Sequence, residues 1–351
     1  MRPRTAHTVR TVRTALATLT AGVAAATCLT AAGPATAAAR NECSPAVTIQ
    51  GFSDALDETT FEGTFVGNLS ALAVDRRGTL AALSDRSALF SLDGRTLQPR
   101  AVTPLADENG AALDSEGLVV DRDGTYLVST EGEPAVRRYS PGGEILGRLA
   151  VPDALRVAPA GRAVSNGTFE GLTLRPDGRT LTAAMEYALS GDSPGTVRFQ
   201  TWRRDARGGF ALGAQYAYRT DAGLGVPEIT ALADGRLLVL ERGYTAGYGN
   251  TVRLYLADPR RATDTSGVAY LTGQPGVRTA AKTLLADLVD CPDLGATARQ
   301  PQPNPLLDNI EAMAVTGKHG GRLDVVLASD DNQSVNQITR FYRLTVRPGG
   351  H

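Results

Sequence analysis

Acidic residues recur in pairs along the chain, one at the start of a short apolar segment and one at the end of the next. In FEGLTLRPDGRTLTAAME, residues 169–186, Glu170 and Glu186 flank two such segments joined by an Asp-Gly turn. Five stretches share this arrangement, and nine of their ten flanking positions are acidic, although Asp and Glu make up 37 of the 351 residues. The ten positions are Ser70 with Asp85, Glu116 with Glu131, Glu170 with Glu186, Glu228 with Glu241, and Glu311 with Asp330.

Carboxylates that gather in one place are costly, because each raises the pKa of its neighbours and burial raises it further. Protonation, basic partners or a bound cation would relieve the repulsion. Arg86 and Arg242 directly follow acids, but two guanidiniums do not balance nine carboxylates. Ca²⁺ takes about six to eight oxygen ligands with tolerant geometry, so it is the expected ion. Its expected ligands are Asp85, Glu116, Glu131, Glu170, Glu228, Glu241, Glu311, Asp330, Asp331 and Asn332.

Metal-assisted hydrolysis is the chemistry that these residues favour. Glu170 or Glu186 would activate a water molecule, and Arg86 or Arg242 would grip an anionic group. The substrate would be a small molecule, and a phosphate ester and a carboxylic ester or lactone stay equally open. Serine esterase chemistry is disfavoured, because one histidine, in a Gly-rich turn, lies away from the chain ends. Zinc or iron is not expected either, since no set of histidines and cysteines is available.

Two alternatives stay open. Each acid could instead cap the backbone of its own strand or tie neighbouring strands together, and a one-residue slip would turn any of these side chains away. The chain could also be a binding module with a structural cation, holding a glycan, a peptide or a component of the cell envelope.

The elements that must position the acids are short β-strands. Apolar or alternating segments rich in Val, Leu, Thr and Tyr are separated by Asp-Gly and Arg-Gly turns, and long helical periodicity is scarce. Four-stranded units recurring about every 50 residues are typical of a β-propeller. The first strand of a blade lines the channel and the second runs back beside it, so paired acids should meet at one rim. We expect five blades. Residues 256–308 could hold a sixth blade, or their segment KTLLADL could form the outer strand of the fourth blade.

The two ends of the propeller should meet. The last repeat supplies three clear strands, and AVTIQGF, residues 46–52, is an unpaired strand that could complete it. Cys43 precedes this strand and Cys291 precedes the last repeat, so we predict a Cys43–Cys291 disulfide that fastens the closure; two free thiols are the alternative.

Residues 1–39 have the pattern of a secretory signal, with four arginines before a long run of Ala, Leu, Thr and Val. An uncleaved anchor is the weaker alternative. We therefore expect a secreted, monomeric chain with a single domain over residues 40–351 and no membrane association after cleavage. The remaining charge is mildly acidic and contains no charge blocks, which argues against nucleic-acid binding.

At the paired acids the sequence resembles the phytase-like family of secreted proteins, often described as having esterase-like activity. The matching pieces are LSALAVD with ALSDR, SEGL, FEGL with its downstream ME, DNIEAMAV and LASDDN, in this order from residue 69 to residue 332. PEIT at 227 and NIEAM at 309 depart from the Glu-Gly pattern while keeping the acid. The resemblance implies a propeller and Ca²⁺-assisted hydrolysis of phosphate or carboxylic esters.

Overall fold

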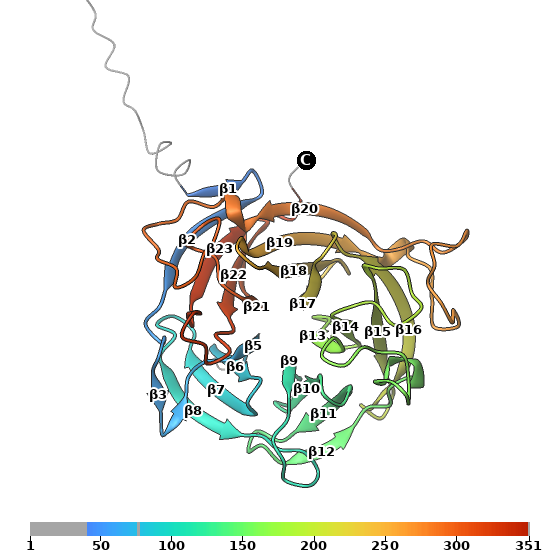
Figure 1. Cartoon of the computed structure of the whole chain (residues 1–351). Coiled ribbons are helices and arrows are strands. Elements are labelled where there is room, and N and C mark those ends of the chain that lie inside the picture. Colours follow the sequence, from blue (N-terminus) through green and yellow to red (C-terminus); the bar gives the residue numbers. More distant parts are fainter. Residues whose placement is uncertain (1–40, 76–77, 350–351) are drawn as a thin grey trace, which may run out of the picture.

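A computed structural model describes residues 41–75 and 78–349, and the signal sequence predicted over residues 1–39 lies outside the described residues. Five antiparallel sheets stand as blades around a central channel (Figure 1). The first strand of each blade, namely β5, β9, β13, β17 and β21, is the innermost. The five-bladed propeller predicted from the repeats is confirmed.

Each blade is built mainly from consecutive strands. The first contains β5 (Leu69–Val74), β6 (Thr79–Ser84), β7 (Ala88–Asp93) and β8 (Pro99–Pro104), and the second β9 (Ser115–Val120), β10 (Tyr126–Thr130), β11 (Ala135–Tyr139) and β12 (Ile145–Arg148). The third contains β13 (Phe169–Leu174), β14 (Thr180–Met185), β15 (Thr196–Arg204) and β16 (Phe210–Arg219). The fourth contains β17 (Gly225–Ala231), β18 (Leu237–Thr245), β19 (Gly249–Asp258) and β20 (Ala281–Asp287).

The fifth blade joins the two ends of the described chain. Its strands β21 (Ile310–His319), β22 (Arg322–Ser329) and β23 (Phe341–Val346) come from the C-terminal end, while β2 (Val47–Ser53) and β1 (Glu42–Ser44) come from the N-terminal end. β2 pairs antiparallel with β23, and Val47 lies opposite Val346. Cys43 and Cys291 form a disulfide across 248 residues. Both the strand closure and the disulfide predicted from the sequence are therefore confirmed.

Residues 256–308 contain no sixth blade. They hold the end of β19, the strand β20, two 3-10 turns, η2 (Pro259–Arg261) and η3 (Leu288–Asp290), and connecting loops. The segment KTLLADL supplies most of β20, the outer strand of the fourth blade. A short hairpin, β3 (Thr60–Phe61) and β4 (Thr64–Phe65), precedes the first blade, and a third 3-10 turn, η1 (Asp153–Leu155), lies between the second and third blades.

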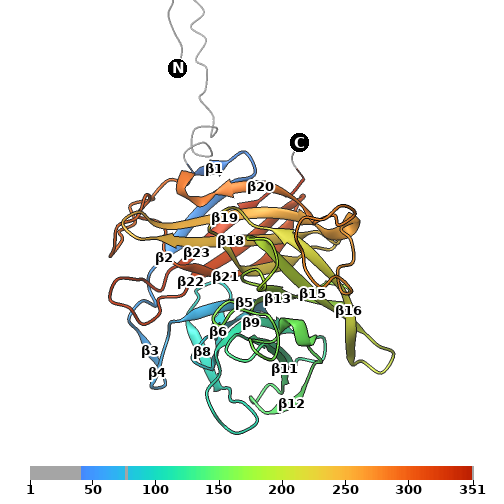
Figure 2. The ribbon, with the colours of Figure 1, turned by 45° about the vertical axis from the view of Figure 1, so that its right-hand side comes forward.

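Apolar side chains fill every gap between neighbouring blades. Five buried clusters lie between successive sheets, one for each pair of neighbours around the ring. A central strand of a blade is covered on both faces, which explains why LAAL in β6 and LLVL in β18 read as continuous apolar runs. Figure 2 shows the same sheets from an oblique side, with β1 of the fifth blade next to β20 of the fourth.

Tight turns join the first and second strands at the rim opposite the paired acids. Gly124, Gly178 and Gly235 each have positive φ, between 67° and 89°. Glycine adopts this left-handed conformation without steric cost, which is why the Asp-Gly pairs recur at these positions. Among the described residues, no helix is long and apolar enough to cross a membrane.

Candidate functional site: an acidic cavity at one mouth of the channel

A polar cavity of about 580 Å³ lies at the rim where the first strands begin and the second strands end. Arg242, two tyrosines and several amide side chains contribute to its walls. The rest of its charge is negative. Its eight carboxylates are Asp85, Asp114, Glu116, Glu131, Glu170, Glu186, Glu311 and Asp330.

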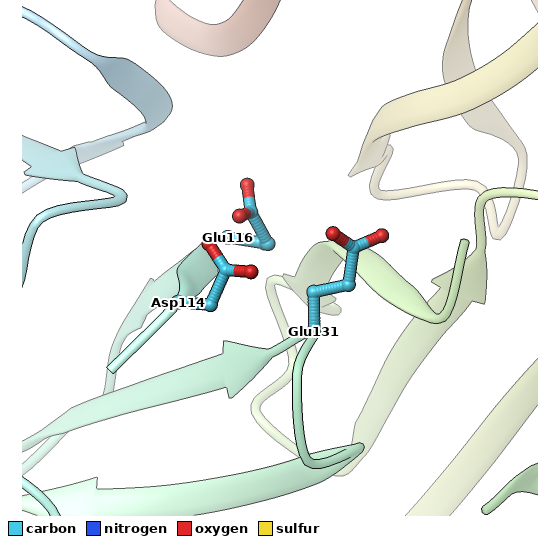
Figure 3. Close-up of side chains that lie close together, drawn as sticks. All are labelled: Asp114, Glu116 and Glu131. Carbon is cyan, nitrogen blue, oxygen red and sulfur yellow. The ribbon is translucent and has the colours of Figure 1, made fainter. Parts of the chain in front are cut away.

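The carboxylates approach one another most closely beside the second and third blades. Asp114 and Glu116 stand at the start of β9 and Glu131 follows β10, and all three side chains point into the same space (Figure 3). Their nearest oxygens lie within 4.8 Å of one another. The same is true of Glu131, Glu170 and Glu186, so Glu131 belongs to both groups. Carboxylate oxygens at such spacing could hold a hard cation such as Ca²⁺.

A β-bulge near the acidic rim directs the acids toward the axis. In every blade the pairing between the first and second strands shifts by one residue at this point. In the third blade Phe169 pairs with Met185 and Leu172 pairs with Ala183. Glu170 and Gly171 therefore both lie opposite one residue, Ala184. Bulges re-aim side chains and are frequent next to functional sites.

Glycine after the acid allows neighbouring first strands to approach closely. A Cβ atom at Gly117 would lie 2.4 Å from the carbonyl oxygen of Glu170, and one at Gly171 would lie 2.6 Å from the backbone nitrogen of Ile229. Larger residues would push the blades apart at these points. The Glu-Gly pairs at 116 and 170 therefore combine an acid of the cavity with the close approach that lets acids from different blades meet.

Glu228, expected among the cation ligands, lies elsewhere. In the fourth blade the shift falls between Gly225 and Glu228, so Glu228 follows the bulge and pairs directly with Leu240. Its side chain lines a different cavity, bordered by residues from the opposite ends of the first strands such as Val74 and Val120. Glu228 accepts a hydrogen bond from the backbone of Ile229, and burial raises its pKa well above the usual range.

Glu241 also lies away from the acidic cavity. It is completely buried and accepts hydrogen bonds from Tyr218 (2.7 Å), from Lys282 (2.6 Å) and from the backbone of Asp221 (2.7 Å). These contacts join the third and fourth blades, the structural role that the sequence left open for each acid. The next residue, Arg242, lines the cavity instead because successive side chains of a strand point to opposite faces.

Of the remaining residues expected at the site, two line the acidic cavity and two do not. Asp330 and Asn332 line the cavity, while Asp331 accepts a hydrogen bond from the backbone of Asn68 and fixes the entry to the first blade. Arg86 lies outside the lining, with 65% of its side chain exposed, and its Nε is 3.5 Å from Asp85 Oδ1.

Burial and mutual repulsion make the acidic cavity electrostatically unfavourable as it stands. Burial, followed by the repulsion of neighbouring carboxylates, raises the pKa of Glu116 and Glu170 well above the usual range. Burial raises the pKa of Glu186 to about 7, against the opposing effect of Arg242, and the pKa of Asp85 to about 6. Asp85 Oδ1 is also buried without a hydrogen-bond partner.

Arg242 supplies positive charge at the cavity wall. It donates a hydrogen bond to Glu311, and its Nη2 lies 3.5 Å from Glu186 Oε1. Asn309 donates a further hydrogen bond to Glu311 (3.0 Å). The Nε of Arg242 is buried and has no hydrogen-bond partner, so one donor of this guanidinium stays free.

Sequence reasoning missed several wall residues, among them Asp114, Asn309 and Tyr187. The sequence does contain a signal that could have identified two of these residues. Asp114 and Asn309 each stand two residues before an acid of the bulge, and residues two apart in an extended strand share a face. Tyr187 follows the end of its strand, where this periodicity no longer applies.

The sequence model of a known family matches residues 64–333 of the chain, and its description is "Phytase-like: Esterase-like activity of phytase". An uncharacterized secreted protein of the fungus Arthroderma benhamiae is 31% identical over 121 residues. That alignment covers 27% of this chain and 23% of the fungal protein, so the matched part is about a quarter of that relative's length.

Solved structures similar to this chain include a gluconolactonase from Xanthomonas campestris and a streptogramin B lyase. The first is 16% identical with a TM-score of 0.41, covering 82% of this chain and 74% of the other. The second is 11% identical with a TM-score of 0.40, covering 87% of this chain and 99% of the other.

Proposed function

This chain belongs to the phytase-like family, and from that premise we propose that it is a Ca²⁺-dependent hydrolase of small phosphate or carboxylic esters. The observation that carries the proposal is the convergence of eight carboxylates on one cavity at the channel mouth. Glu241, a structural acid, is matched by Tyr218 and Lys282, whereas the cavity gathers eight carboxylates around one guanidinium, that of Arg242.

The donor set suits a hard cation. The proposed ligands are drawn from Asp85, Glu116, Glu131, Glu170, Glu311, Asp330 and Asn332, with Asp114 added. Glu116, Glu131 and Glu170 are buried and their oxygens are closely spaced, and Asp85 Oδ1 is buried without a hydrogen-bond partner. Ca²⁺ accepts such carboxylates from several parts of a chain. Glu228, Glu241 and Asp331 are left out because their side chains have other surroundings.

The side chains at the wall have properties suited to ester hydrolysis. When bound, Ca²⁺ would polarise the carbonyl or phosphoryl oxygen of the substrate. Glu186, with a pKa of about 7, would accept a proton from an attacking water molecule near neutral pH. Glu170 is the alternative base. The free Nε of Arg242 would donate a hydrogen bond to the oxygen on which negative charge develops.

Chelation and two variants test this proposal. The purified protein, freed of metal, would be assayed on phosphate monoesters, phytate, aryl esters and lactones with and without added Ca²⁺. Hydrolysis should require Ca²⁺ and fall by at least about a hundredfold in Glu170→Gln or Glu186→Gln. Glu144→Gln, which changes an exposed acid in an outer turn of the second blade, is the matched control.

A binding module with a structural cation is the second candidate. The exposed Tyr244 and several amides, including Asn166, Gln300 and Gln337, surround the acidic cavity and could hold a polar ligand. Absence of turnover on every substrate, with Ca²⁺ raising only the melting temperature, would favour this function over hydrolysis.

Secretion as a monomer is part of the same proposal. The fungal relative is described as a secreted protein, and the disulfide suits an oxidising compartment. The proposed partner is a small-molecule substrate rather than a nucleic acid or a membrane.

A further inference from the structure

A second cavity lies beside the acidic one, farther from the axis and between the third and fourth blades. Its volume is about 720 Å³. Ala188 and Pro194 come from the loop between β14 and β15, Val197 from β15, and Ala222 and Leu224 from the loop between β16 and β17. These segments all end at the acidic rim, so the two cavities open on the same side of the propeller.

Tyr187 belongs to the walls of both cavities. Its ring is fixed between two glycines: a Cβ atom at Gly167 would lie 2.9 Å from Cδ2, and one at Gly225 would lie 2.9 Å from Cε1. Both glycines lack positive φ, so space for the ring explains them better than backbone conformation does. Its hydroxyl lowers the pKa of the Glu186 carboxyl group, against the larger effect of burial. Tyr187 therefore forms the partition between an acidic space and an apolar one.

Two charged residues border the second cavity: Arg219, whose side chain is exposed, and Asp221, which is paired. Asp221 accepts hydrogen bonds from Arg253 (2.5 Å), Lys282 (2.8 Å) and Tyr255 (2.5 Å). The apolar part of the wall consists of methyl and methylene groups of Ala188, Pro194, Val197, Ala222 and Leu224. An uncharged apolar group is thus the complementary occupant.

We propose that this second cavity is a subsite for the apolar acyl group of a carboxylic ester, a proposal that rests on the hydrolase function proposed above. The reacting carbonyl would lie next to Glu186 in the acidic cavity, and the acyl chain would pass Tyr187 and extend outward between the blades. The proposal selects carboxylic esters over phytate, which has no apolar part to fill the subsite and whose own negative charges would face the acidic wall.

Para-nitrophenyl esters from acetate to octanoate provide the kinetic test in the presence of Ca²⁺. Burial of each added methylene should raise kcat/KM by up to about fourfold until the cavity is full. Ala222→Trp and Ala188→Phe, which fill the cavity from two different loops, should remove this dependence on chain length, so that kcat/KM for the octanoate falls to about that for the acetate. Ala206→Trp, in an exposed turn between β15 and β16, is the control.

Binding of 1-naphthol, measured by calorimetry, separates the subsite from catalysis. The wild type and Ala206→Trp should bind it, and both cavity variants should bind it at least tenfold more weakly. Naphthol binding of this kind without ester hydrolysis would refute the hydrolase and retain the apolar subsite. No binding by the wild type, or equal binding by folded cavity variants, would overturn the subsite whatever the hydrolysis results.

Discussion

Glu241 and Arg242 are consecutive residues of β18, yet their side chains serve different places. Glu241 lies between the third and fourth blades in hydrogen bonds with Tyr218 and Lys282, while Arg242 lines the acidic cavity and donates to Glu311 of the fifth blade. A difference of one position along a strand thus separates a residue that joins blades from one that faces the proposed substrate.

Glu241→Gln should therefore reduce stability without altering the acidic cavity. The substitution removes a buried charge from Lys282 and disturbs two further hydrogen bonds, which we expect to cost about 3 kcal/mol of unfolding free energy. Urea denaturation measures the loss, and calorimetric titration of the folded variant with Ca²⁺ should give an affinity within twofold of wild type. A large loss of Ca²⁺ affinity with little change in stability would contradict the assignment.

Glu228→Gln should have little effect on either stability or Ca²⁺ affinity. Burial raises the pKa of Glu228 well above its usual range and so favours the protonated form, whose shape and acceptor oxygen the amide analogue retains. We expect stability at pH 7 within about 1 kcal/mol of wild type and unchanged Ca²⁺ affinity. Glu170→Gln, measured alongside, should weaken Ca²⁺ binding at least tenfold. Equal losses in the two variants would place Glu228 in the cation site.

The different surroundings of Glu228 and Glu241 depend on strand register, and this register could not be predicted from the sequence. The five repeats, their turns and the pattern of apolar strands were enough for the propeller, its closure and the disulfide, because those features repeat or have one compatible partner. The direction of Glu228 and Glu241 was not predictable, since it depends on where a bulge shifts the pairing in the fourth blade. Tyr187 was missed because its position depends on glycines far away in sequence, Gly167 and Gly225.

The metal-free protein should become less stable as pH rises from about 4 to about 7. Glu186 and Asp85 have folded pKa values of about 7 and about 6, against ordinary values of 4.5 and 3.8. The folded state therefore binds more protons than the unfolded state in this range, and its stability falls as those protons are lost. Melting temperatures of chelated protein across the range measure the effect.

Saturating Ca²⁺ should flatten or reverse that trend, because the ion prefers the deprotonated carboxylates. Glu186→Gln should weaken the pH dependence of the chelated protein, and Glu144→Gln should leave it unchanged. A chelated protein whose stability rises with pH throughout this range would contradict the buried acidic cavity.

Gly225→Ala should impair the site through Tyr187 while preserving the fold. The added methyl group would lie 2.9 Å from both the Tyr187 ring and Cγ of Glu186, so both side chains must move. We expect kcat/KM for para-nitrophenyl hexanoate to fall at least tenfold and its pH profile to shift, because the hydroxyl of Tyr187 stabilises the charged form of Glu186. Gly51→Ala, at a glycine with open space around its Cβ position, is the matched control.

Replacing both cysteines should weaken the closure of the ring selectively. The Cys43–Cys291 bridge closes a loop of 248 residues, and in the chain-entropy model such a constraint stabilises the folded state by up to about 5 kcal/mol. Cys43→Ser/Cys291→Ser should therefore unfold at lower urea concentration than wild type. In this double variant, amides of β2 should exchange with solvent sooner than amides of β14, because β2 comes from the N-terminal end and completes the last blade. Reduction of the wild type with dithiothreitol should reproduce the loss, and should have no effect on the double variant. Equal acceleration of exchange in β2 and β14 would show that the bridge stabilises the propeller as a whole rather than its closure.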